Sequence, residues 1–119
     1  MARIMIVSCR KIRDVLCVAC MKCFKGIDER AGKFERYKDE PLELVALAEC
    51  GDCPGLVMPK LALVNTLAKS MGRDYDVVHF GTCVVKATTT AACPIDITDL
   101  AEKIKMAFGK EVVIGTHPW

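Results

Sequence analysis

Four short apolar runs divide the chain, and segments with helical spacing of apolar residues lie between them. The runs cover residues 3–8, 42–48, 76–81 and 111–115. The first has no polar alternation, which is typical of a central strand covered on both faces. We therefore predict four strands, with helices packed against both faces of the sheet.

Two of the predicted helices have clear boundaries. The first runs from about residue 59 to 71, because Pro59 suits a first helical turn and Gly72 a C-terminal stop. The second is capped by Asp96 and ends at Gly109. The apolar stripes of these helices are formed by Leu61, Val64, Ala68 and Met71, and by Ile97, Leu100, Ala101, Ile104 and Phe108.

The remaining segments are less regular. Residues 11–24 fit a loop that passes into a helix, and residues 27–37 are expected to be a second helical piece over the sheet. Residues 84–92, rich in threonine and alanine, are expected to be a loop. Strands that alternate with helices favour parallel pairing. We predict one three-layer α/β domain over residues 1–119, with a four-stranded parallel sheet of flavodoxin-like topology and strand order 2-1-3-4.

Composition narrows the functional classes. The 119 residues are 52% hydrophobic, and 17 basic and 15 acidic residues are interleaved to give a net charge of +2. A nucleic-acid binder is expected to concentrate basic residues on one face, which this chain does not do. No apolar run approaches the roughly 20 residues of a membrane span, and no signal peptide is recognisable. We expect a cytoplasmic protein that binds neither nucleic acid nor membrane.

Eight cysteines are the unusual feature of the composition. In a reducing compartment, so many cysteines indicate metal or redox chemistry rather than disulfides. Several of them follow predicted strands, and the carboxyl ends of parallel strands meet at one edge, where ligands bind. The candidate metal ligands at this edge are Cys9, Cys17, Cys20, Cys23, Cys50, Cys53, Cys83, Cys93 and His117.

Thiolates favour zinc, iron–sulfur clusters and Cu(I), and spacing alone does not choose between zinc and a cluster. The spacing of Cys17, Cys20 and Cys23 also begins a ferredoxin-type cluster motif. Nine soft ligands exceed one four-coordinate site, so either some are bystanders or there are two sites. Single buried cysteines also occur as small hydrophobic residues.

A thiol–disulfide redox protein is the alternative function. Residues 50–55 (CGDCPG) place Cys50 and Cys53 on a strand-to-helix turn, where thioredoxin-like proteins carry their reactive pair. Such a protein would need a redox partner protein, and His117 or Asp52 would move protons. His79 lies within a predicted strand and is expected to be a core residue.

The combined pattern resembles the CGGC-domain family over nearly the whole chain. The matching features are the cysteine after the first strand, Cys23 followed by Phe24, residues 34–37 (FERY), residues 50–55, Cys83, residues 93–94 (CP) and the terminal residues 115–117 (GTH). The resemblance implies a metal-binding domain and supplies no reaction. It carries the ligand role to Cys9, Cys23, Cys50, Cys53, Cys83, Cys93 and His117. This chain departs from the family at Asp52, where a second glycine is expected.

Overall fold

One parallel sheet of four strands organises the protein, in a computed structural model that describes residues 2–9, 20–49, 57–85 and 96–116. The strands are β1 (Ala2–Ser8), β2 (Leu42–Glu49), β3 (Val77–Phe80) and β4 (Glu111–Ile114). Their order is β2-β1-β3-β4 and each neighbouring pair is parallel. The predicted sheet and its order are therefore confirmed.

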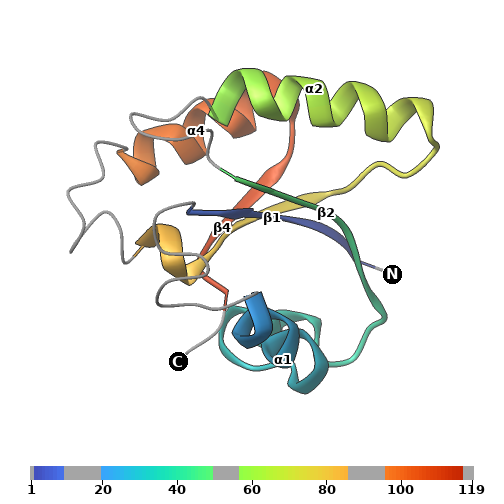
Figure 1. Cartoon of the computed structure of the whole chain (residues 1–119), viewed down its shortest axis with the longest axis vertical. Coiled ribbons are helices and arrows are strands. Elements are labelled where there is room, and N and C mark those ends of the chain that lie inside the picture. The colour runs from blue at the N-terminus through green and yellow to red at the C-terminus, as the bar shows by residue number, and fades with distance from the viewer. Residues whose placement is uncertain (1, 10–19, 50–56, 86–95, 117–119) are drawn as a thin grey trace.

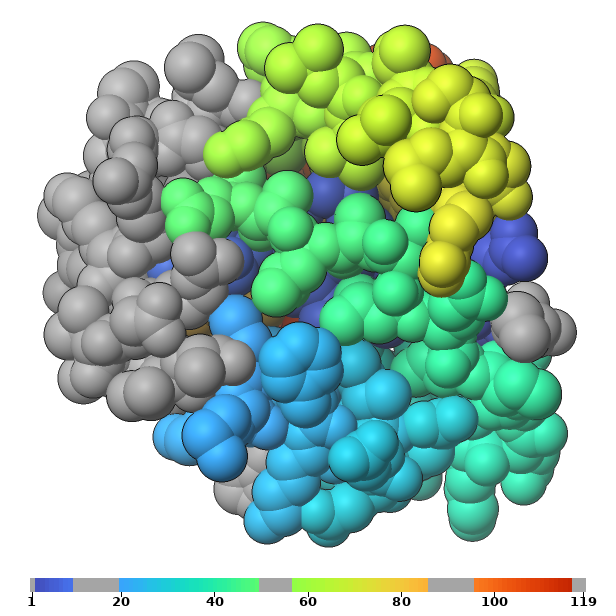
Figure 2. All heavy atoms as spheres, turned by 45° about the vertical axis from the view of Figure 1, so that its right-hand side comes forward, coloured from blue at the N-terminus to red at the C-terminus, as the bar shows by residue number. Residues whose placement is uncertain are grey.

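Helices cover both faces of this sheet. α2 (Val57–Ser70) and α4 (Ile97–Phe108) lie on one face, and α1 (Met21–Glu29) lies on the other with the 3₁₀-helix η2 (Gly32–Tyr37) (Figure 1). Figure 2 shows the edge strand β2 at the surface between α2 and α1. The three-layer α/β fold is confirmed.

Both faces of β1 are covered, which explains why residues 4–7 of this strand are all apolar. Met5 and Val7 pack into the core on the α2 and α4 side, whereas Ile4 and Ile6 pack into the core on the α1 side. Alternate side chains point to opposite faces of a strand, so both sets must be apolar when both faces are covered. Cys9 continues the first set.

The two well-bounded helices agree with the sequence except at one residue. The Asp96 side chain accepts a hydrogen bond from the N–H of Asp99 at 3.2 Å, and Gly109 ends α4 with φ of 65°. In α2, Leu61 and Ala68 are buried and Val64 is half-buried. Met71 was placed in this stripe wrongly, because the helix ends at Ser70 and Met71 is 63% exposed.

The single helical piece predicted over residues 27–37 is wrong. α1 ends at Glu29, Arg30 adopts a left-handed conformation with φ of 52°, and η2 follows. The N–H of Ala31 bonds to Gly26 O and that of Arg30 to Ile27 O, which is a Schellman motif. Glycine usually occupies this position, so an arginine there gives no sequence signal that the helix ends.

The loop predicted over residues 84–92 is also wrong where it can be compared. Residues 82–85 are helical, with the N–H of Val84 bonded to Gly81 O at 2.9 Å, whereas residues 86–92 lie outside the described residues. β-Branched residues are weak helix formers, so local composition did not indicate this turn. Burial of Val84 in the core stabilises this helical turn.

Over the described parts of the chain, no helix has the length and apolar character needed to cross a membrane.

Candidate functional site

Two of the predicted ligands meet at the carboxyl edge of the sheet. Cys9 follows β1 and Cys83 follows β3, 74 residues later, yet the backbone N–H of Cys9 donates to Cys83 Sγ at 3.2 Å. Both residues are buried, with 3% and 6% of their surface exposed. The sulfur of Cys83 thus lies beside the end of the neighbouring strand.

Gly81 makes this approach of the two strand ends possible. Its N–H donates to Val7 O at 2.8 Å, which extends the pairing of β3 with β1 by one residue. A Cβ atom at position 81 would lie 3.0 Å from Cys83 Sγ and 3.3 Å from Val7 O. Any larger residue would therefore press against the thiol that Cys9 contacts.

A threonine pair joins the ends of β3 and β4 and reaches a third cysteine. The N–H of Thr82 donates to Thr116 Oγ1 at 3.1 Å, and the N–H of Thr116 donates to Thr82 Oγ1 at 3.2 Å. Cys23 Sγ, on the first turn of α1, lies 3.3 Å from Thr116 Oγ1 and is also buried. Thr116 therefore connects α1 to the same edge that carries Cys83.

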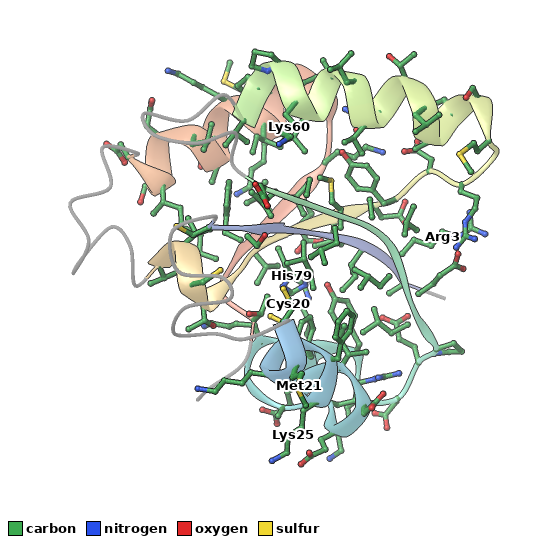
Figure 3. All side chains as sticks on the ribbon, viewed as in Figure 1. Arg3, Cys20, Met21, Lys25, Lys60 and His79 are labelled. Carbon is green, nitrogen blue, oxygen red and sulfur yellow. The ribbon has the colours of Figure 1, made fainter. Side chains whose placement is uncertain are left out.

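Cys20 stands at the start of α1. It adopts a left-handed conformation with φ of 57° and is 5% exposed. Figure 3 shows Cys20 at the end of α1 that faces the sheet, whereas Met21 and Lys25 project away from it. Cys20 and Cys23 thus approach the carboxyl edge of the sheet from the face covered by α1.

The described cysteines divide between the two faces of the sheet. Cys9 and Cys83 belong to the core on the α2 and α4 side, whereas Cys23 belongs to the core on the α1 side. Among residues 2–9, 20–49, 57–85 and 96–116, no three His, Cys, Asp or Glu side chains form a group suited to a metal ion. No disulfide joins any two of the cysteines in these ranges.

Behind the edge, a buried histidine supports the exit of β4. His79 is fully buried; its Nδ1 lies 3.0 Å from Gly115 O and its Nε2 lies 2.7 Å from the Tyr37 hydroxyl. Burial lowers the pKa of His79 below its ordinary value, and the hydrogen bond to Gly115 opposes this shift. His79 is thus a core residue, as predicted, and it positions the peptide that precedes Thr116.

The other candidate ligands lie outside the described residues. They are Cys17, Cys50, Cys53, Cys93 and His117. In the parallel register of β1 and β2, Ser8 pairs with Glu49, and a register shift between Ile4 and Met5 sets this alignment. In the sequence, Cys9 follows Ser8 and Cys50 follows Glu49.

Three residues at this edge were not among the predicted site residues. Gly81, Thr82 and Thr116 place the cysteines without being soft ligands. Small and hydroxyl residues after strand ends are common in turns, so their types gave no specific signal. Gly81 ends a predicted strand, Thr82 and Thr116 directly follow predicted strands, and Thr116 also belongs to the GTH motif of the family resemblance.

A family model for the CGGC domain matches residues 3–117. The chain belongs to the CGGC domain family. The match spans every strand and all four described cysteines, so the predicted resemblance is confirmed.

A relative supports this assignment without adding a function to the CGGC domain. An uncharacterized protein of Methanocaldococcus jannaschii is 34% identical over 120 residues, which cover 97% of this chain and 86% of the relative. No solved structure matches the chain.

Proposed function

We propose that this CGGC domain binds zinc or an iron–sulfur cluster through cysteine thiolates at the carboxyl edge of its sheet. The observation that carries the proposal is the contact between Cys9 and Cys83, which brings cysteines from two adjacent strand ends together. A backbone N–H that points at a sulfur is also the type of contact that adjusts metal-bound thiolates.

The register of the sheet indicates the other two ligands. Ser8 pairs with Glu49, Cys9 and Cys50 follow these two residues in the sequence, and Cys53 comes three residues after Cys50. We infer a first ligand set of Cys9, Cys50, Cys53 and Cys83. Four thiolates are the number that a tetrahedral zinc ion or a cluster requires.

The remaining soft ligands form a second group. Cys23 packs on the opposite face of the sheet and lies 3.3 Å from Thr116 Oγ1. We infer that this group extends the first site or forms a second one, and its members are Cys17, Cys20, Cys23, Cys93 and His117. A reducing compartment such as the cytoplasm would keep all these thiols available to a metal.

Metal analysis of protein purified without oxygen tests the proposal. Iron, zinc and acid-labile sulfide are assayed and the visible spectrum is recorded. Brown protein with sulfide indicates a cluster, and colourless protein with stoichiometric zinc indicates a zinc site. Cys83→Ser is expected to lose most of the bound metal, because it removes one of four ligands.

Cys23→Ser is the matched comparison, since it changes a cysteine with similar burial on the other face. It is expected to retain the metal of the first set. Metal-free protein in which Cys50 and Cys53 cycle through a disulfide would contradict the proposal and favour the thiol redox alternative.

A further inference from the structure

A cavity lies between α2 and α4, at the end of the sheet opposite the cysteines. Its volume is about 460 Å³, and its lining includes Asp74 and Lys110, which precede β3 and β4. Pockets for small molecules in proteins begin at roughly 300 Å³. The cavity is therefore large enough for a small ligand and is separate from the proposed metal site.

A buried asparagine with incomplete hydrogen bonding lines this cavity. Asn65 is 8% exposed, although it occupies a position of α2 that faces the core. Its Oδ1 accepts a hydrogen bond from the Tyr75 hydroxyl. Burial raises the pKa of Tyr75 to about 12, so this hydroxyl stays protonated and acts as the donor.

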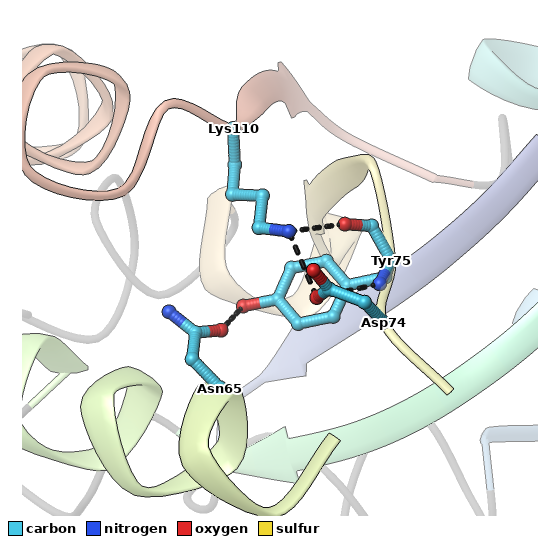
Figure 4. Close-up of polar contacts among 4 residues, drawn as sticks. All are labelled: Asn65, Asp74, Tyr75 and Lys110. Carbon is cyan, nitrogen blue, oxygen red and sulfur yellow. Dashed lines mark hydrogen bonds and ion pairs between the residues drawn. The ribbon is translucent and has the colours of Figure 1, made fainter. Parts of the chain in front are cut away.

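The amide nitrogen of Asn65 consequently has two hydrogens to donate. Figure 4 shows this nitrogen turned away from Tyr75. Within the part of the chain that the structure describes, no acceptor pairs with it. Buried side-chain donors in folded proteins nearly always have a partner. The unfilled donors therefore indicate that a ligand with acceptor oxygens completes them.

Charge specifies the ligand further. Lys110 is already committed, because its Nζ lies 2.9 Å from Asp74 Oδ1, bonds to Tyr75 O and stands 4.5 Å from the centre of the Tyr75 ring (Figure 4). Lys69 also lines the cavity and forms no ion pair with any described residue. Two lysines and one aspartate leave the cavity with one net positive charge.

The rest of the wall comes from Thr66, whose hydroxyl donates to Ala62 O, and from the apolar side chains of Ala62, Ala107 and Phe108. We propose that this cavity binds a small monocarboxylate with a short apolar chain. The carboxylate accepts from Asn65 Nδ2 and pairs with Lys69, and the apolar chain packs against Phe108. Asp74 disfavours a dianion such as phosphate, because it adds a negative charge beside the same space.

Titration of the ¹⁵N-labelled full chain with butyrate tests this site by NMR. The expected result is a saturable shift of the Asn65 side-chain NH₂ signals, with a Kd on the order of 1 mM. Butyramide has the same shape without the charge and is expected to bind at least about tenfold more weakly, because charge-assisted hydrogen bonds are the stronger ones.

Two lysine variants give the matched control. Lys69→Gln is expected to weaken butyrate binding about tenfold. Lys60→Gln changes a lysine of the same helix that does not line the cavity, and it is expected to leave binding unchanged. Equal effects of the two variants, equal binding of butyrate and butyramide, tighter binding of inorganic phosphate, or no shift at Asn65 would each overturn the proposal.

Discussion

His79 has a fixed protonation pattern because of its two partners. Gly115 O can only accept, so Nδ1 carries the hydrogen, and Nε2 therefore accepts from the Tyr37 hydroxyl. A second proton would remove the acceptor that Tyr37 needs, inside a fully buried site. The neutral ring is the form that holds the exit of β4 in place.

The stability of the protein should consequently depend on His79 as pH changes. Burial holds the pKa of His79 below its ordinary value of 6.5 in the folded chain. As pH falls through about 6.5, the unfolded chain binds a proton at this residue before the folded chain does, so the free energy of unfolding decreases. The free energy of unfolding stops decreasing for this reason once the pH is below the pKa of His79 in the folded chain.

Urea denaturation across this pH range measures the effect. His79→Gln should remove this part of the pH dependence, although the variant is less stable overall. His117→Gln changes the other of the two histidines in the chain and should retain it. Identical pH profiles for the wild type and His79→Gln would contradict the assignment.

At the scale of elements, strand ends and helix ends determine where the cysteines lie. The β3 exit turns directly into the helical residues 82–85, and this turn brings Cys83 over the end of β1. Gly81 is the residue that permits the turn, because a side chain there would contact Cys83 Sγ and Val7 O. The position of the thiol thus depends on a glycine two residues earlier.

Gly81→Ala should therefore reduce metal binding without unfolding the protein. Its Cβ would lie 3.0 Å from Cys83 Sγ, so the thiol that contacts Cys9 must shift to accommodate it. Metal content per chain, measured alongside circular dichroism, detects the change. An alanine variant that retains wild-type metal content would show that the thiol position is not critical.

Gly109→Ala is the control for this substitution. Gly109 has φ of 65° and open space around its Cβ position, so alanine there meets only the strain of the left-handed conformation. We expect a loss of about 1 kcal/mol in the free energy of unfolding and no change in metal content.

The helix boundaries also show which helix ends the local sequence predicts. Caps with specific side chains were predictable, since Asp96 and Gly109 are typical residues for the two ends of α4. The end of α1 was not, because Arg30 replaces the usual glycine and is held by hydrogen bonds of its own side chain. Its side chain donates to the backbone O of Ile27 and Tyr37. Ile27 lies in α1 itself, whereas Tyr37 lies in η2, beyond the end of the helix.

At the scale of the whole molecule, the sheet separates two cores, one on each face. Cys9 and Cys83 belong to one core and Cys23 to the other, with the Thr82–Thr116 pair between them. A metal bound at this edge would join segments of β1, β2 and β3 that are far apart in sequence. Metal binding should therefore stabilise the whole fold.

Thermal unfolding of metal-loaded and chelator-treated protein tests this coupling. At a free metal concentration of one hundred times Kd, binding adds about 2.7 kcal/mol to stability. That increment raises the unfolding midpoint by on the order of 10 °C for a domain of this size. Cys83→Ser should show no difference between the two treatments, and the same result for the wild type would rule out coupling between metal and fold.

The sequence by itself determined the sheet, its parallel order and the position of Cys9 and Cys83 after the carboxyl ends of β1 and β3. These properties follow from apolar periodicity and from the order of strands and helices, which are local features of the chain. It also placed His79 in the core, because a strand covered on both faces buries both sets of its alternating side chains.

Only the tertiary structure decided which groups meet. The Cys9–Cys83 contact spans 74 residues and the Cys23–Thr116 contact spans 93, so neither leaves a local pattern. The incomplete hydrogen bonding of Asn65 likewise appears only when Tyr75 occupies one side of its amide. The periodicity of apolar residues indicates the face on which a residue lies. The partners of that residue depend on how distant segments pack. The chemistry of this edge depends on those partners and therefore on the tertiary structure.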